Sequence, residues 1–190
     1  MIKPKSYIEA EEYLEIERNA EYKSEYFNGE MFALAGTTRE HNMILVNLIS
    51  ALSRELGDKP CQIFASDLRL KVNPTGLYTY PDLVVVCGEQ KFEDEKFDTL
   101  LNPTLIIEIL SELTEAYDRG RKFESYRQLE SLKEYILVSS KYMKIEKFLK
   151  QMDGKWLLTE EGNMEKSIEL SSINCAVRLS DIYRNIPFKN

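Results

Sequence analysis

The chain has 190 residues, of which 43% are hydrophobic and 30% are charged, and its formal net charge is −7 with a pI near 5.0. This length and composition predict a single globular domain, residues 1–190, with a sizeable core. The excess of acidic residues argues against a protein that coats nucleic acid non-specifically, because such binding depends on Lys and Arg neutralising phosphates. A local basic patch stays compatible with this charge.

The sequence shows no sign of a membrane segment or of an export signal. No apolar run approaches the roughly 20 residues that span a bilayer. The first residues, MIKPKSYIEAEEYLEIE, become acidic where a signal peptide needs its apolar segment. We therefore expect a cytoplasmic protein that does not bind membranes.

The cysteines indicate neither a zinc site nor a disulfide framework. There are three of them, Cys61, Cys87 and Cys175, and they are far apart and fit no CxxC spacing. An odd number at such spacings predicts buried free thiols.

Capping and turn signals define the elements of the N-terminal half. The predicted elements are a helix over Tyr7–Glu17, strands over Lys23–Phe27 and Glu30–Leu34, a helix over about Arg39–Leu56, and short strands over Gln62–Ser66 and Asp67–Val72. Ser6 and Glu9 have capping-box spacing before the first helix. Asn28 and Gly29 favour a type I′ turn between the first two strands. Thr38 is the candidate cap of the second helix.

Strands dominate the second half. After a turn at Asn73–Gly76, the predicted elements are strands over Thr79–Val86 and Thr104–Leu110, a basic helix from near Tyr117 or Asp118 to Leu129, a strand over Glu134–Ser139, a hairpin of Lys144–Leu149 and Lys155–Thr159, a strand near Ile168–Leu170 and a short helix around Leu179–Tyr183. Asp118 is the candidate cap of the basic helix. Together the elements predict an α/β (α+β) fold with helices against a mixed sheet and additional hairpins.

Two carboxylates occur inside β-branched runs that should be buried. Asp82 begins the run LVVV, and Glu108 lies in the middle of LIIEIL. A buried carboxylate needs a cation or hydrogen bonds, or it is forced neutral. Asp82 bonded to nearby amides, or Glu108 paired with a core Arg or Lys, would be a purely structural explanation. Together the two could instead bind Mg²⁺, which is held by one or two carboxylates, waters and substrate phosphate.

Other residues are candidates to complete such a site. Lys122, in the basic helix, could orient an attacking water or stabilise phosphate charge, and Arg119 and Arg121 are alternatives to it. His41, the only histidine, shares a helix face with Leu45, Leu48 and Leu52, which is more typical of a half-buried structural residue. Further carboxylates that could converge on the metal are Glu25 and Asp67.

Several stretches point to a known family. They are KSEYFNGEMFALAGTTREHN, SDLRLKV, LYTYPDLVVVCGE, LLNPTLIIEILSELTEAYDRGRKFESYRQLESLKEYILVS, and the later KW and DIY. Over nearly the whole chain the sequence resembles the Uma2 family of the PD-(D/E)xK restriction-endonuclease-like superfamily. The resemblance implies a mixed sheet flanked by helices, with Asp82 as the PD aspartate and Glu108 as the (D/E) residue.

The chain departs from the superfamily pattern at the lysine. Leu110 stands where D/E-x-K would have lysine, and in Uma2-like proteins that lysine is in the following helix, which selects Lys122. A second departure is Glu112-Leu113, where the family often has Ser-Pro-Ser-Thr or similar. This pair lies on the link between the strand and the helix and could change the shape of that loop.

These observations predict a Mg²⁺-dependent (or Mn²⁺-dependent) endonuclease acting on DNA. Asp82 and Glu108 would bind the metal, Lys122 would position water or phosphate, and Glu25 and His41 would support them. A homodimer could assemble the basic groove that the acidic monomer lacks. Two alternatives stay open: a non-catalytic binding or regulatory module with the nuclease fold, and a hydrolase of a small phosphodiester.

Overall fold

The computed structural model describes residues 7–188. Within them the helices are α1 (Ala10–Asn19), α2 (Arg39–Leu56), α3 (Glu115–Tyr117), α4 (Phe123–Tyr126) and α5 (Leu179–Ile182), together with a π-helical turn η1 (Asp118–Lys122) and a 3-10 turn η2 (Ser171–Ile173). The strands are β1 (Ser24–Phe27), β2 (Glu30–Ala33), β3 (Cys61–Ala65), β4 (Arg69–Val72), β5 (Leu77–Thr79), β6 (Leu83–Cys87), β7 (Thr99–Leu100), β8 (Leu105–Leu110), β9 (Glu134–Ser139), β10 (Ile145–Lys150), β11 (Trp156–Glu161), β12 (Ser167–Leu170) and β13 (Cys175–Arg178).

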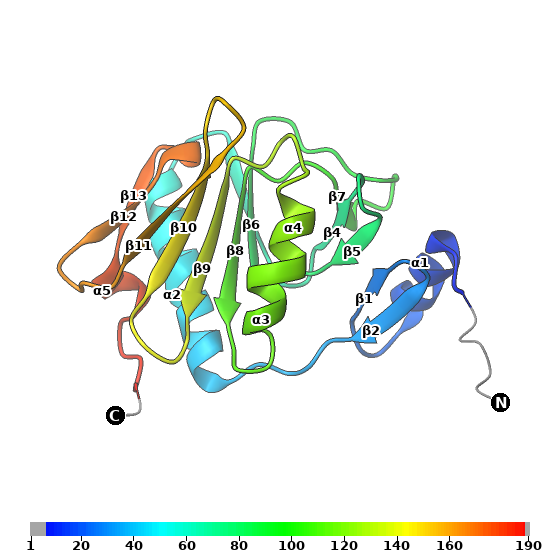
Figure 1. Cartoon of the computed structure of the whole chain (residues 1–190), viewed down its shortest axis with the longest axis horizontal. Helices are drawn as coiled ribbons and strands as arrows, with labels where there is room; N and C mark the ends of the chain where they lie inside the picture. Colours follow the sequence, from blue (N-terminus) through cyan, green and yellow to red (C-terminus); the bar gives the residue numbers. More distant parts are fainter. Residues whose placement is uncertain (1–6, 189–190) are drawn as a thin grey trace.

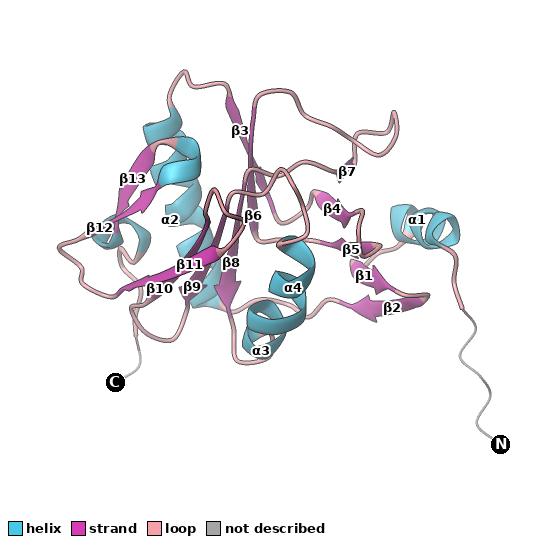
Figure 2. Cartoon of the chain, turned by 45° about the horizontal axis from the view of Figure 1, so that its top comes forward, coloured by secondary structure: helices cyan, strands magenta, loops and turns pink. Residues whose placement is uncertain are grey.

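The fold is built on a mixed six-stranded sheet in the order β11-β10-β9-β8-β6-β3. β8 and β9 are parallel, and the other neighbours are antiparallel. α2 covers one face of this sheet and the α3–α4 segment covers the other (Figure 1). A second sheet, ordered β2-β1-β5-β4-β7, lies beside the first with α1 at its outer side, and β12 and β13 form a separate ribbon near α2 (Figure 2). This arrangement confirms the predicted mixed α+β fold.

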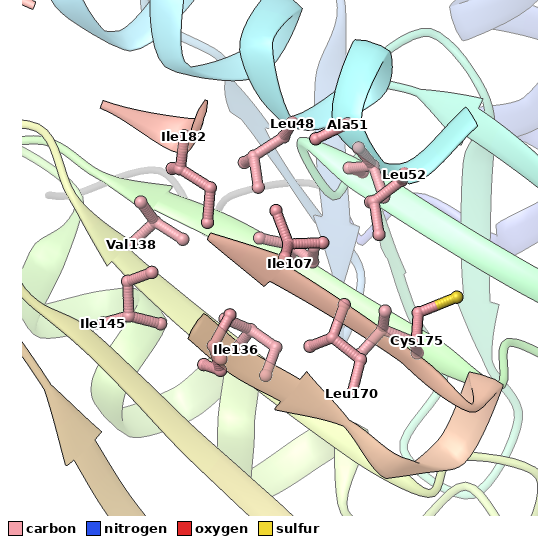
Figure 3. Packing of buried hydrophobic residues seen from close by; sticks show 14 of the residues in the cluster. Leu48, Ala51, Leu52, Ile107, Ile136, Val138, Ile145, Leu170, Cys175 and Ile182 are labelled. Atoms are coloured by element: carbon pink, nitrogen blue, oxygen red, sulfur yellow. The ribbon is translucent and has the colours of Figure 1, made fainter. Parts of the chain in front are cut away.

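The central strands are buried on both faces because each face has a helical layer. Alternate residues of a strand point to opposite sides. Leu105, Ile107 and Ile109 of β8 pack in the apolar cluster under α2, which includes Leu48 and Leu52 (Figure 3). Ile106 and Leu110 instead join a second cluster with α4 and the five-stranded sheet. Glu108 shares that second face, so the fold places a carboxylate between two apolar layers.

Turn chemistry and capping agree with the sequence in the N-terminal half. Asn28 and Gly29 have φ values of 50° and 80°, as a type I′ turn requires, and join β1 to β2. The Thr38 side chain accepts a hydrogen bond from the amide of His41 at 3.2 Å, so it caps α2 as predicted. Ser6 lies outside the described residues, and α1 begins three residues after the predicted start.

The predicted strand Thr79–Val86 was wrong as a single element. β5 ends at Thr79 and belongs to the five-stranded sheet, whereas β6 begins at Leu83 and belongs to the six-stranded sheet. Pro81 lacks an N–H and restricts the residue before it, so the ladder breaks there. Asp82 therefore lies at the point where the chain passes from one sheet to the other.

The basic helix also differs from its prediction. It begins at Glu115, and Asp118 lies inside the π-helical turn rather than at the cap. The last turn, α4, ends at Tyr126, before the predicted end at Leu129. The strand β13 near the C-terminus was not predicted, because it has only four residues, which is too short for a clear alternating pattern in the sequence.

The expectation that all cysteines are free thiols was wrong for two of them. Cys61 of β3 and Cys87 of β6 are opposite one another in the antiparallel ladder, 4.0 Å apart at Cα, and form a disulfide. Only the strand register brings these distant positions together. Cys175 is a buried free thiol, as predicted.

Within residues 7–188, no helix is long and apolar enough to cross a membrane.

Candidate active site

Asp82, Glu108, Lys122, Glu25 and His41 converge near the carboxyl end of β8, the lower end of the sheet in Figure 1. They come from separate parts of the fold: the β5–β6 link, β8, η1, β1 and the first turn of α2. All five predicted site residues are therefore brought together. Their contacts distinguish a partly open part of the site, around Asp82, from a closed part, around Lys122.

Asp82 is held by the backbone of β8 and by His41. Its Oδ2 accepts a hydrogen bond from the amide of Ile109 at 2.7 Å and lies 3.1 Å from Nε2 of His41. The Asp82 side chain is 16% exposed, whereas that of His41 is 6% exposed. His41 is thus a mostly buried residue that orients a carboxylate, and Asp82 is the residue of this pair with access to solvent.

Glu108 is buried and has a partner at each oxygen. Its Oε1 accepts hydrogen bonds from Nζ of Lys122 at 3.1 Å and from the hydroxyl of Tyr126 at 2.9 Å. Its Oε2 accepts the amide of Asp82 at 3.2 Å. Burial raises the pKa of Glu108 to about 8, and the negative charges of Asp118 and Asp82 add to this, while Lys122 opposes it.

Lys122 lies at the centre of three carboxylates. Its Nζ is 3.1 Å from Glu108, 3.3 Å from Glu25 and 3.4 Å from Asp118. Burial alone would lower the pKa of Lys122, but these carboxylates raise it well above its usual range. Lys122 is therefore a buried, permanently charged ammonium group.

Glu25 connects the five-stranded sheet to this cluster. Its Oε1 also accepts a hydrogen bond from the hydroxyl of Thr79, and its Oε2 accepts one from the hydroxyl of Tyr117 at 2.9 Å. Glu25 therefore fixes Lys122 from the side opposite β8, across the gap between the two sheets.

Asp118 and Tyr126 belong to the cluster but were not predicted. Burial raises the pKa of Asp118, and one of its carboxylate oxygens, Oδ1, has no hydrogen-bond partner within the described residues. They lie four residues before and four residues after Lys122, a spacing that places side chains on one side of a helix. That spacing was the available signal for both residues.

Three further candidates lie outside the cluster. Asp67 forms an ion pair with Lys23 at 2.8 Å, and its side chain is 92% exposed. Arg121 is exposed, and Arg119 pairs with Glu115 and Glu146 instead. Lys122 is therefore the basic residue of this segment that reaches the carboxylates.

The protein atoms alone do not form a complete metal cage. Within residues 7–188, no group of three or more His, Cys, Asp or Glu side chains is arranged to hold a metal ion. The cluster does contain four carboxylates, on Asp82, Glu108, Asp118 and Glu25, against the one ammonium group of Lys122. When all four are ionised, this excess of negative charge favours a cation.

Comparisons with known proteins identify a family for this chain. The family model Uma2, described as "Putative restriction endonuclease", matches residues 10–180. Two uncharacterized proteins of Synechocystis sp. (strain ATCC 27184 / PCC 6803 / Kazusa) are similar: sll1609 is 38% identical, with 86% of this chain and 93% of the relative covered, and slr1290 is 36% identical, with 95% and 94% covered.

A solved structure has the same fold. The crystal structure of a protein from Anabaena variabilis ATCC 29413, described as a "putative nuclease belonging to DUF820", matches with a TM-score of 0.75 over 91% of this chain and 96% of that one. Its sequence identity is 16%, so this likeness concerns the fold. With the family match over most of its length and the two close relatives, this chain belongs to the Uma2 family.

Proposed function

We propose that the protein is an endonuclease that hydrolyses phosphodiester bonds in DNA with the help of Mg²⁺ or Mn²⁺. The observation that carries this proposal is the meeting of Asp82, Glu108 and Lys122 at one end of the sheet. The family description and the nuclease-like structural neighbour support the general class of activity. DNA as the substrate, the metal and the roles of the residues are our proposal.

Asp82 and Glu108 would hold the metal. Both supply carboxylate oxygens, the ligands that Mg²⁺ prefers, and two protein ligands suffice because the ion keeps several waters and binds substrate phosphate. Asp82 is partly exposed, and its Oδ1 has no hydrogen bond with the described residues. A bound metal would polarise the phosphoryl oxygen and lower the pKa of a water molecule.

The surrounding residues would position these groups. His41 and the amide of Ile109 fix the direction of the Asp82 carboxylate. If Lys122 releases Glu108 to the metal, its ammonium group stays protonated, because it keeps its ion pairs with Glu25 and Asp118. Its ammonium group would then donate a hydrogen bond to the phosphate or to the attacking water.

Nicking of supercoiled plasmid tests the proposal. Wild type should nick DNA with Mg²⁺ or Mn²⁺, and Asp82→Asn should lose at least about a hundredfold in rate. Asp67→Asn is the matched control, since it removes an exposed carboxylate outside the cluster and should act as wild type does. Absence of cutting with either metal, or equal cutting by Asp82→Asn, would overturn the proposal.

A second candidate is a binding or regulatory module without turnover. The observation that favours it is the ion pair of Glu108 with Lys122, because a carboxylate that is already paired needs no metal. Calorimetric titration with Mn²⁺ separates the two. The nuclease should bind Mn²⁺ and lose this binding in Asp82→Asn, whereas the module should give no heat of binding.

We also propose one domain over residues 1–190, acting in the cytoplasm as a homodimer on DNA. The net charge of −7 argues against a monomer with a basic groove for DNA. We propose the dimer because such a groove could be assembled between two copies. Light scattering with and without duplex DNA measures the assembly, and a monomer in both samples would contradict it. The Cys61–Cys87 disulfide argues against the cytoplasm, because thiols in that compartment are mostly reduced.

A further inference from the structure

A surface cavity of about 580 Å³ opens beside the first turns of α2. Its lining residues come from α2 and from the segment after α5: Arg39, Asn42, Met43, Val46, Asn47, Arg184 and Asn185. Cavities of this size are typical of small-ligand sites. None of the five candidate active-site residues lines it, so the cavity is a separate feature of the surface.

The wall of the cavity is fixed by hydrogen bonds. The side-chain amide of Asn47 donates to the carbonyl oxygens of Ile182, at 2.9 Å, and of Arg184, at 3.0 Å. Ile182 packs beside Leu48 in the core (Figure 3). The segment that carries Arg184 is therefore attached to α2, and the cavity exists before any ligand binds.

The charge of the cavity is opposite to that of the protein. The lining contains two arginines and no acidic residue, although the chain has a net charge of −7. Five other arginines form ion pairs: Arg18, Arg54, Arg69, Arg119 and Arg178. Within residues 7–188, Arg39 and Arg184 have no carboxylate partner. Both guanidinium groups are thus available to an anion.

The remaining lining residues indicate more than a simple anion. Arginine binds phosphate through two parallel hydrogen bonds. The amide groups of Asn42 and Asn185 can donate to and accept from the edge of a base. Val46, which is 60% exposed, offers an apolar surface for the face of a base. Together these residues can contact the phosphate, the base edge and the base face of a nucleotide.

The position of the cavity relates it to the candidate active site. His41, whose Nε2 contacts Asp82, lies between Arg39 and Asn42 on α2. Val46 is five residues beyond His41, about 7.5 Å along the helix axis. At about 100° per residue, His41 lies on the opposite side of α2 from the lining residues, so a nucleic-acid strand that contacts Asp82 would reach the cavity by passing around the first turn of the helix.

We propose that this cavity binds a nucleotide of the nucleic-acid strand, away from the scissile phosphate and on the other side of α2. The proposal rests on the proposed nuclease function and adds to it a substrate contact outside the group of metal ligands. Arg39 and Arg184 bind the phosphate, and the asparagines and Val46 bind the base.

Fluorescence anisotropy with a labelled single-stranded oligonucleotide tests this, using the full chain and Ca²⁺ in place of Mg²⁺. The double variant Arg39→Gln, Arg184→Gln should bind about tenfold more weakly or worse. The magnitude of the slope of log K against log salt should fall by about 1.4, which is about 0.7 for each lost arginine contact with a single strand. Arg127→Gln is the matched control, because Arg127 is exposed, lacks a carboxylate partner within residues 7–188 and does not line the cavity.

A second pair of variants tests the cavity without removing arginine. Val46→Glu places a carboxylate in the cavity and should weaken binding strongly, whereas Ser50→Glu, exposed one turn later on α2 and outside the lining, should have little effect. Competition with free AMP shows whether a single nucleotide is enough for binding. If strong competition occurs at Kd values well below that of the oligonucleotide, a free nucleotide is the ligand and the proposed strand contact is wrong.

The outcomes separate the two proposals. If wild type binds and cuts nucleic acid but both cavity variants match their controls, the cavity proposal is wrong and the nuclease proposal stands. If wild type binds no oligonucleotide, both proposals fail. Asp82→Asn should lose cutting while it keeps binding, because Asp82 does not line the cavity.

Discussion

The two faces of β8 are equally buried but chemically different. On one face Leu105, Ile107 and Ile109 pack in an apolar cluster with α2. On the other face Glu108 meets Lys122, and both side chains are almost fully buried. Burying charges costs desolvation free energy, and the attraction between the buried charges often does no more than offset this cost. Apolar residues on the second face would therefore give a protein at least as stable.

The difference shows how this fold separates stability from chemistry. The face under α2 needs only shape and volume, so its contribution should not depend on pH. The opposite face holds several charges in one cluster, where burial raises the pKa values of Glu108 and Asp118 and the neighbouring carboxylates raise that of Lys122. Such clusters are typical of functional sites, since structure alone would favour apolar residues.

Lys122→Met should give the largest loss of stability. The substitution leaves Glu108, Glu25 and Asp118 buried without their common cation, and breaking a buried ion pair in this way costs about 3–5 kcal/mol. Urea unfolding at pH 8 measures the free energy of unfolding. The loss should shrink toward pH 5, where carboxyl groups with raised pKa values bind protons.

Arg127→Met is the control for Lys122→Met. It removes the same charge from an exposed position and should change the free energy of unfolding by less than about 0.5 kcal/mol. A Lys122→Met protein as stable as wild type at pH 8 would mean that the carboxylates do not depend on Lys122.

Ile107→Ala should destabilise the protein through the opposite face. Ile107 is 1% exposed, and deleting its methyl groups leaves a cavity, at a cost of about 2–5 kcal/mol. Here the loss should be the same at pH 5 and pH 8. Nicking activity measured well below the melting temperature should be unchanged, and a pH-dependent loss would contradict the proposed separation of the two faces.

Elements with strong local signals could be predicted from the sequence. α2 was predicted from its cap and periodicity, and β8 and β9 from continuous β-branched runs. The break between β5 and β6 had a local signal in Pro81, but the sequence did not show that the two strands belong to separate sheets. The disulfide depended in the same way on strand register.

The site was predictable in unequal parts. Glu108 was identified because a carboxylate inside an apolar strand needs an explanation, and Asp82 because it begins such a run. Lys122 depended on the family resemblance, since spacing alone did not distinguish it from Arg119. Asp118 was missed because it was interpreted as a helix cap, although its four-residue spacing from Lys122 was a signal; the π-helical turn that contains it was not predicted.

Glu108→Gln should change the pH dependence of stability. The pKa of Glu108 is about 8 in the folded protein, above its ordinary value of 4.5. The folded state therefore holds this proton more tightly than the unfolded state does. The contribution of Glu108 makes the metal-free protein less stable as pH rises from about 4.5 to about 8, by at most about 1.4 kcal/mol per pH unit.

Urea unfolding in EDTA across this pH range isolates that contribution. The slope of Glu108→Gln should be more positive than that of wild type, because the amide does not titrate, whereas Ile107→Ala should keep the wild-type slope. Equal slopes for wild type and Glu108→Gln would show that Glu108 is ionised throughout, held by Lys122 alone. Adding Mn²⁺ should stabilise wild type most above pH 8, where Glu108 has already lost its proton and the ion binds without displacing one, and this gain should be reduced in Glu108→Gln.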